Sequence, residues 1–207
     1  MIIDFHAHCF PDELAYKAVP SLAKKAGIPY FLNGTIRDIK ASMKEAGIDK
    51  SIVLPIATKP SQTETINTWA SSIQDESIVA FGSIHPEYKY WQEELKRIKQ
   101  LGLKGIKFHN DYQGIFVDEE KMFPIYEEAF KLDLIMVFHA GLDIGLSGPY
   151  HCTPDRLLKV VRAFSGAKIV AAHMGGLVLD IYVDEEGTID RFCVELIPLY
   201  KAIENDY

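Results

Sequence analysis

The chain has 207 residues and a formal net charge of −7, with 48% hydrophobic and 25% charged residues. This is the composition of one ordinary globular domain, so we expect residues 1–207 to form a single domain. The acidic balance, with Lys and Arg scattered along the chain, argues against nucleic acid or an anionic membrane as the main partner. The charge says little about a small-molecule substrate, which we expect as the partner on other grounds given below, and a homo-oligomer stays open.

Cysteine usage and the N-terminus predict the compartment. Three cysteines, Cys9, Cys152 and Cys193, form no CxxC pair and leave an odd count, which is typical of a reducing cytoplasm. The start of the chain has no basic segment followed by a long apolar one, and no apolar run is long enough to span a bilayer. We therefore expect a cytoplasmic protein without a membrane segment.

Short β-branched runs alternate with segments of helical spacing along most of the chain. The predicted strands are 2–8, 51–57, 78–85, 103–109, 134–140 and 168–173. Two of the segments between them, 122–130 and 157–164, have apolar residues at helical spacing. Ser61 with Glu64 fits a capping box, and Thr153-Pro154 fits a helix start. Gly47, Gly102 and Gly166 each precede the next strand, as helix stops do.

This alternation predicts an α/β fold, a parallel sheet covered by helices. Strand starts recur about every 30 residues from the second strand on, which suits a (β/α)8 TIM barrel of roughly 250 residues. A doubly wound sheet is the alternative, but it usually has a glycine-rich turn after its first strand. That position reads His6-Ala7-His8-Cys9-Phe10-Pro11, so the barrel is favoured.

All seven histidines lie at or just after predicted strand ends. They are His6, His8, His85, His109, His139, His151 and His173. In a parallel barrel these positions share the C-terminal rim, where active sites occur. Histidines placed for packing would also fall in helices, and none does. The positions therefore indicate a site rather than a core.

The motif His6-Ala7-His8 is the most specific local signal. Residues two apart in a strand point to the same side, so both imidazoles should face the barrel mouth and reach one divalent ion. Asp4 lies on the same side and could orient a histidine. His139 and His173 each end an apolar run and precede glycine, whereas His85 and His151 read equally well as structural residues.

Lys107 shares one face of its predicted strand with His109, so both should point into the mouth. A lysine there is unfavourable unless it is paired, modified or functional. The sequence thus indicates Lys107 as a functional residue.

These residues resemble a known family. The segments 4–8, 104–109, 139–141 and 172–176 look like the amidohydrolase superfamily, and most like its "amidohydrolase 2" branch, which includes nonoxidative decarboxylases. The resemblance covers residues 1–176. It implies a distorted TIM barrel of the metal-dependent hydrolase type with one or two divalent ions, usually Zn²⁺. TatD-like nucleases and PHP phosphoesterases also begin with HxH, but their strand-four glutamate and strand-two Asp-His pair do not occur here.

The resemblance also implies roles for individual residues. His6, His8 and His139 would be metal ligands, and His173 would be a further ligand or the acid/base group. Lys107 matches a position where some branches carry a carbamylated lysine, and is taken with His173 as catalytic. His109 is expected to contact the substrate.

The end of the chain departs from the family pattern. An aspartate from strand eight is expected at the metal, yet only 31 residues follow Gly176, where two more βα units need about 60. Residues 177–184 read as a strand and 189–203 as a helix interrupted at Pro198. We expect an open barrel, incomplete after strand six, with 177–207 atypical or truncated. We also expect that Asp180, Asp184 and Asp190 do not complete the metal site.

Three functions remain as hypotheses. The first is a metal-dependent hydrolase of a small molecule, in which the metal activates water and His173 moves protons. The second is nonoxidative decarboxylation of a small unsaturated or aromatic acid. The third is a degenerate barrel that binds without catalysis.

Overall fold

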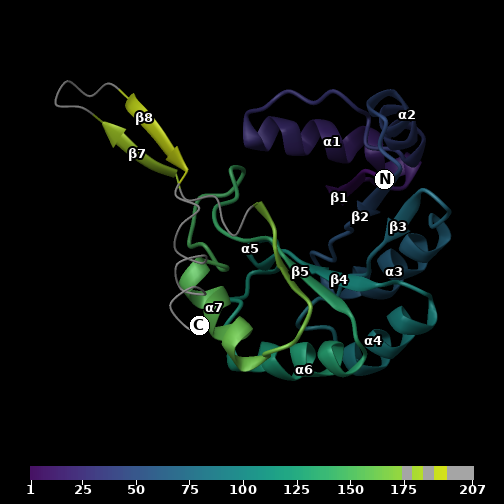
Figure 1. Ribbon diagram of the computed structural model, residues 1–207, viewed down its shortest axis with the longest axis vertical. Helices are drawn as coiled ribbons and strands as arrows, with labels where there is room; N and C mark the ends of the chain where they lie inside the picture. Colours follow the sequence, from purple (N-terminus) through teal and green to yellow (C-terminus); the bar gives the residue numbers. More distant parts are fainter. Residues whose placement is uncertain (174–178, 184–188, 195–207) are drawn as a thin grey trace.

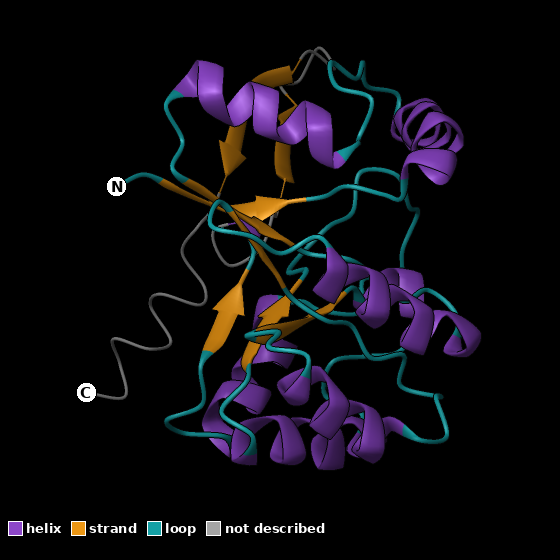
Figure 2. Cartoon of the chain, turned by 90° about the vertical axis from the view of Figure 1, so that its right-hand side faces the viewer, coloured by secondary structure: helices purple, strands orange, loops and turns teal. Residues whose placement is uncertain are grey.

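The computed structural model describes residues 1–173, 179–183 and 189–194, the last two ranges by their backbone. Strands alternate with helices, and helices cover the outer side of the strands (Figures 1 and 2). The elements are β1 Ile3–Ala7, α1 Asp12–Ala26, α2 Ile36–Ala46, β2 Lys50–Val53, η1 Pro60–Gln62, α3 Thr63–Ser72, β3 Ile78–Ala80, α4 Trp91–Gln100, β4 Gly105–Phe108, α5 Asn110–Gln113, η2 Glu120–Met122, α6 Phe123–Lys131, β5 Ile135–Phe138, α7 Pro154–Ala163, β6 Ile169–Ala171, β7 Leu179–Val183 and β8 Ile189–Val194.

The first six strands follow one another in space as they do in the sequence. Strands β1, β2 and β3 form one parallel sheet, and β4, β5 and β6 form a second. A single parallel bridge between Gly82 and Ile106 joins the two sheets. The Gly82 N–H donates to the Gly105 carbonyl and the Lys107 N–H to the Gly82 carbonyl, both at 2.8 Å. The six strands thus form the wall of a parallel barrel, as predicted.

Each predicted strand is confirmed, although all are shorter than predicted. Helices α6 and α7 lie over the predicted segments, and Thr153 precedes α7 as its N-cap residue. Gly47 ends α2 in the left-handed conformation, with φ of 68°. The capping box at Ser61 was wrong, because η1 occupies that position and Gln62 is the N-cap residue of α3. Within the described residues, no helix combines the length and apolar character that crossing a membrane requires.

The segment that follows β6 differs from the prediction. Residues 179–183 form β7, as expected, but 189–194 form the strand β8 rather than the start of a helix. The two strands pair antiparallel with each other and lie apart from the six central strands (Figure 1). β-Branched and aromatic residues on both sides of Gly187 are typical of a hairpin, a signal that outweighs the helical spacing. Residues 195–203 lie outside the described part.

Alternation along the strands gives the barrel two apolar layers. Ile106 and Phe108 face outward and pack into the main core, which also contains residues of α4, α6 and α7. A smaller inner cluster contains Ile52, Leu54, Phe81, Val137 and Ala172. Lys107 lies between the two outward residues of β4 and pairs in register with Val137. It therefore faces the barrel interior.

The barrel is open beside β1. All four residues of β4 are buried, whereas Ile3 and Phe5 of β1 are 45% and 39% exposed. Among the described residues, β1 pairs only with β2 and β6 only with β5. This agrees with the expectation of a barrel incomplete after strand six. Asp184 and the side chains of Asp180 and Asp190 lie outside the described residues.

Candidate metal centre

Five of the histidines come together at one end of the barrel. His6 lies in β1 and His8 directly after it, while His109 and His139 directly follow β4 and β5. His173 follows β6 by two residues. Because these strands are parallel, their carboxyl ends meet at the same rim. The rim therefore holds every histidine that the sequence assigned to the site.

The five imidazoles form a connected row. The Nε2 atoms of His6 and His8 are 3.0 Å apart, and the rings of His6 and His173 have centroids 4.9 Å apart. Nε2 of His173 lies 2.9 Å from Nδ1 of His139. The rings of His139 and His109 are stacked, with centroids 4.0 Å apart and an interplanar angle of 13°. His173 thus connects the β1 pair to the β4–β5 pair.

A carboxylate lies at the β4–β5 end of this row. Oδ2 of Asp143 is 3.1 Å from Nε2 of His109 and 3.9 Å from Nε2 of His139. Asp143 belongs to the loop after β5, and sequence reasoning missed it. The signal was a carboxylate four residues after a strand-end histidine, between Gly141 and Gly145.

The predicted ligands are not all equally close. In the described part of the chain, one group of three ligating side chains has its ligand atoms within 4.8 Å of one another, and it comprises His109, His139 and Asp143. His139 belongs to this group, whereas His6 and His8 form a separate pair. The assignment of His6, His8 and His139 as ligands of one ion stays a prediction.

The charge states of the cluster suit a cation. Burial, followed by the neighbouring His109, lowers the pKa of His139 to about 3. Burial, followed by Lys107, lowers the pKa of His6 to about 3. The hydrogen bond from His109 lowers the pKa of Asp143. Neutral imidazoles beside a charged carboxylate are the forms in which these groups bind metals.

One buried ring nitrogen supports this fit. Nε2 of His139 has no hydrogen-bond partner among the described residues, although it faces Oδ2 of Asp143. Buried polar atoms are nearly always paired in folded proteins. An ion bound within the cluster would give this nitrogen a partner, so the residues present fit a divalent metal.

Lys107 lies one step deeper in β4 than His109. Its side chain is fully buried, and Nζ has no hydrogen-bond partner among the described residues. Burial lowers the pKa of Lys107 to about 7. The amine is therefore poorly solvated and titrates near neutral pH, so its charged form is also present there.

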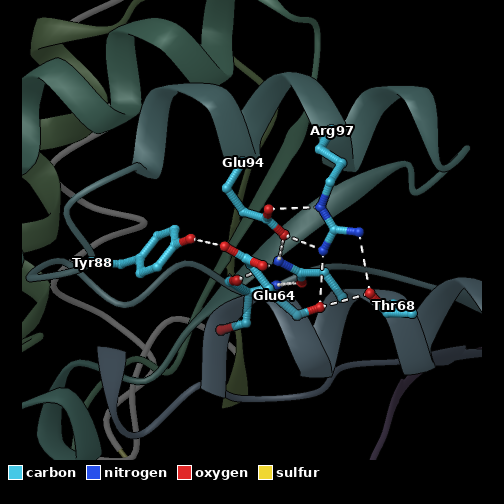
Figure 3. A network of polar contacts seen from close by, with 7 residues as sticks. Glu64, Thr68, Tyr88, Glu94 and Arg97 are labelled. Carbon is cyan, nitrogen blue, oxygen red and sulfur yellow. Dashed lines mark hydrogen bonds and ion pairs between the residues drawn. The ribbon is translucent and has the colours of Figure 1, made fainter. Parts of the chain in front are cut away.

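A polar network behind β3 and β4 supports this lysine. The Ser83 hydroxyl donates to the Lys107 carbonyl at 2.9 Å, and the Asn67 side chain binds both the N–H and the carbonyl of Ser83. Asn67 also donates to the buried Glu94, which pairs with Arg97 (Figure 3). The network thus connects α3 and α4 to the backbone under the site.

The remaining polar residues of the rim make hydrogen bonds that orient side chains or loops. Nδ1 of His8 lies 2.7 Å from the Leu54 carbonyl, which orients the ring. Asp4 accepts the backbone N–H of His6 rather than a ring N–H. Nδ1 of His85 accepts the Glu87 N–H, and Nδ1 of His151 lies 2.8 Å from Asp111.

Similar proteins support the same fold. A manganese-bound 5-carboxyvanillate decarboxylase from Novosphingobium aromaticivorans is 20% identical, with a TM-score of 0.64 over 84% of this chain and 65% of that one. A 2,6-dihydroxybenzoate decarboxylase is 19% identical, with a TM-score of 0.60 over 84% and 67%. An uncharacterised TIM-barrel protein from Bordetella bronchiseptica is 14% identical, with a TM-score of 0.66 over 84% and 67%. The chain thus spans about two thirds of the length of these structures.

A search of curated proteins gave no match. The model of one protein family, described as amidohydrolase, matches residues 3–187. This range includes all six barrel strands and every histidine of the row. The chain belongs to the amidohydrolase family.

Proposed function

We propose that the chain carries the site of a metal-dependent lyase that decarboxylates a small aromatic or unsaturated acid without oxidation. The observation that carries this proposal is the buried, unpaired Lys107 beside a row of imidazoles. An amine in such surroundings favours an anion as its partner, because pairing offsets its loss of water. A carboxylic acid therefore suits this site better than a neutral substrate.

The similar structures support the same chemistry. Two of those described above are named as decarboxylases, and both act on carboxylated phenols by their names. One contains manganese, so Mn²⁺ and Zn²⁺ are both suitable ions to test. At 19–20% identity these structures support the fold, and the substrate class is our inference from the site.

Each residue has a proposed role. His6, His8 and His139 bind the ion, which would polarise the acidic substrate when bound. His173 supplies the proton, and its position between the two histidine pairs suits this role. Lys107 attracts the carboxylate, and His109, whose ring lies 4.4 Å from that of Tyr112, contacts the substrate ring.

In the reaction, the bond between the ring carbon and its carboxylate breaks. Carbon dioxide leaves, and the electron pair of the broken bond remains on the ring carbon. That carbon then takes a proton from His173, so hydrogen stands where the carboxylate was. No oxidant or reductant is needed. We expect His173→Asn to lower kcat at least about 100-fold with little change in KM, as for a group that acts in the transition state.

Product analysis tests the proposal. The full chain, loaded with Mn²⁺ or Zn²⁺, is incubated with 2,6-dihydroxybenzoate and 5-carboxyvanillate, and released carbon dioxide is measured. The reverse reaction is followed as incorporation of ¹³C-bicarbonate into the matching phenols. Metal-free protein and His173→Asn are the controls. Turnover in which the product gains water and no carbon dioxide forms would contradict decarboxylation.

Hydrolysis is the second candidate, and one observation favours it. Asp143 places a carboxylate oxygen within 3.1 Å and 3.9 Å of two imidazole nitrogens. A carboxylate in that position can accept a proton from an attacking water. Incorporation of ¹⁸O from labelled water into the product distinguishes this reaction. A chain that binds the ion but transforms none of these acids would instead fit the non-catalytic hypothesis.

A further inference from the structure

We propose that a cavity between α1 and α3 is a binding site for a small apolar carboxylic acid. This α1–α3 cavity is lined by Leu14, Lys17, Ile56, Gln62 and Trp69 among others, and the proposed function does not use it. Its volume is about 570 Å³, within the roughly 300–1,000 Å³ of small-molecule sites. A folded protein partner would instead need a broad surface of roughly 800 Å².

Two helices supply the walls of the α1–α3 cavity. Leu14, Ala18 and Ser21 line it from α1, and their spacings of four and three residues place them on one face of that helix. Ile66 and Trp69 line it from α3. Leu14 is 53% exposed although it is apolar. An apolar ligand in the cavity would remove part of this surface from water, which is favourable.

The floor of the cavity belongs to the barrel. Cys9 and Pro55 line it just after β1 and β2, and both residues are buried. Next to Pro55, the Leu54 N–H donates to the Ala7 carbonyl at 2.9 Å, which continues the pairing of the two strands up to the cavity. The floor is therefore in place before a ligand binds.

Lys17 gives the cavity its preference for an acid. Among the described residues that line the cavity, it is the one with a formal charge. Glu13 lies four residues before it on α1, yet Lys17 forms no ion pair within the described part of the chain. Its Nζ lies 5.3 Å from the centre of the Tyr16 ring. A ligand carboxylate would give this ammonium group a charged partner.

Gln62 adds a hydrogen-bond donor that is held in one orientation. Its Oε1 accepts the N–H groups of Thr58 and Lys59 at 3.0 Å and 3.1 Å, and the Thr58 hydroxyl at 3.0 Å. Its Nε2 has no partner among the described residues, although the side chain lines the cavity. A carboxylate oxygen can accept a hydrogen bond from this nitrogen. One cation, one amide donor and apolar walls together favour an acid with a short apolar chain.

Tryptophan fluorescence tests the proposal, because Trp69 lines the cavity and Trp91 does not. The probes are octanoate and 1-octanol, which have the same chain length and differ in charge. The full chain carrying Trp91→Phe is titrated with each probe. We expect a saturable change with octanoate at lower concentration than with 1-octanol.

Two lysine variants test the head group. In the Trp91→Phe background, Lys17→Met should weaken octanoate binding about fivefold, the upper range for an exposed ion pair. It should leave 1-octanol binding unchanged. Lys24→Met removes another exposed lysine of α1 that does not line the cavity. This matched control should bind octanoate like the parent.

Filling the cavity gives a second test. Ser21→Phe places an aromatic ring on the α1 wall, and we expect it to abolish saturable binding of both probes. Thermal denaturation provides a readout that does not depend on Trp69, because a ligand of the folded chain raises its Tm. Octanoate should raise the Tm of the wild type and leave that of Ser21→Phe unchanged. The same scan shows that each variant is folded.

The contrary outcomes are distinct. Undiminished octanoate binding in Ser21→Phe would overturn the proposal, and so would equal losses in Lys17→Met and Lys24→Met. Equal affinity for octanoate and 1-octanol would refute the preference for an acid. A wild-type dimer that Ser21→Phe converts to a monomer in sedimentation would assign the cavity to a second copy of the chain. None of these measurements uses metal content or turnover, so a failure here leaves the proposed function standing.

Discussion

Strands β4 and β1 bring histidines to the same rim in different surroundings. β4 has strands β3 and β5 as neighbours, and all its residues are buried. β1 has one described neighbour and leaves Ile3 and Phe5 partly exposed. Accordingly, His109 is buried, whereas His8, just after β1, is exposed. The same parallel topology therefore holds one half of the candidate site more firmly than the other.

The largest expected effect comes from shortening an isoleucine to alanine in each of the two strands. Ile106 of β4 is fully buried in the main core, and Ile3 of β1 is 45% exposed. We expect Ile106→Ala to lower the free energy of unfolding by about 4 kcal/mol, because it loses burial and leaves a cavity. Ile3→Ala should cost less than about 1 kcal/mol. Urea denaturation of both variants measures the difference, and equal losses would show that β1 is as well packed as β4.

The buried amine of β4 gives a test of opposite sign. Lys107→Met keeps the length of the side chain and removes an unpaired polar group, so we expect the metal-free protein to gain about 3 kcal/mol at pH 7. The expected cost is the loss of activity if Lys107 attracts the substrate carboxylate. Thermal and urea unfolding measure the gain in stability.

The pH dependence of this effect has a definite sign. Burial lowers the pKa of Lys107 from 10.5 to about 7. Between these values the unfolded chain binds more protons than the folded one, so this group makes stability rise with pH from about 7 to 10.5. Lys107→Met should lack that rise. An identical slope in both proteins would mean that Lys107 stays charged in the folded state.

Much of the difference between β1 and β4 could be predicted from the sequence. The features that could not be predicted were missed for physical reasons. The strand-end positions of His109, His139 and His173 could be predicted because each histidine ends a short apolar run that reads as a strand. Asp143 was missed because it belongs to a loop, whose conformation periodicity does not encode, and its spacing from His139 was the one signal of it. The β8 strand was misassigned because a short apolar run has both helical and strand readings, which only its pairing with β7 decides.

The sequence predicted that the barrel is open, but not how the two sheets of the barrel are joined. Among the described residues β1 and β6 each have one strand neighbour, which agrees with the expected barrel that is open after strand six. The single bridge between β3 and β4 was not foreseen. Sequence patterns locate strands, but they do not give the register or the length of the ladder between two of them.

The polar network behind β3 and β4 links α3 and α4 to these strands, and breaking it should have an intermediate effect. Glu94 is 3% exposed, accepts from Asn67 at 2.7 Å and pairs with Arg97, which is partly exposed. We expect Glu94→Ala to cost about 2 kcal/mol, below the usual loss for a fully buried pair, because Arg97 can regain water. Glu94→Gln keeps an acceptor for Asn67 and should lose less. Equal losses in urea denaturation would assign the effect to packing alone.

The smallest expected effect concerns Gln113, a second link across the strand ends. Its amide donates to the Ala57 and Ile84 carbonyls at 3.1 Å and 2.9 Å, and its oxygen accepts the His109 N–H at 3.2 Å. It thus ties the loop after β2 and the loop after β3 to the residue that begins the β4 side of the site.

Gln113→Met keeps the size of the side chain and removes all three hydrogen bonds. We expect a loss of about 1 kcal/mol in the free energy of unfolding, at the lower end of the cost of leaving buried backbone groups unpaired, because the methionine side chain keeps the site packed. Gln74→Met is the matched control, since the hydrogen bonds of Gln74 are long, at 3.4 Å and 3.5 Å, and should contribute little.

Amide hydrogen exchange gives the sharper readout. The His109 N–H should exchange faster in Gln113→Met and unchanged in Gln74→Met, because only the first variant removes its acceptor. Unchanged exchange at His109 would mean that packing against β5, rather than this side chain, holds the β4 half of the site in place.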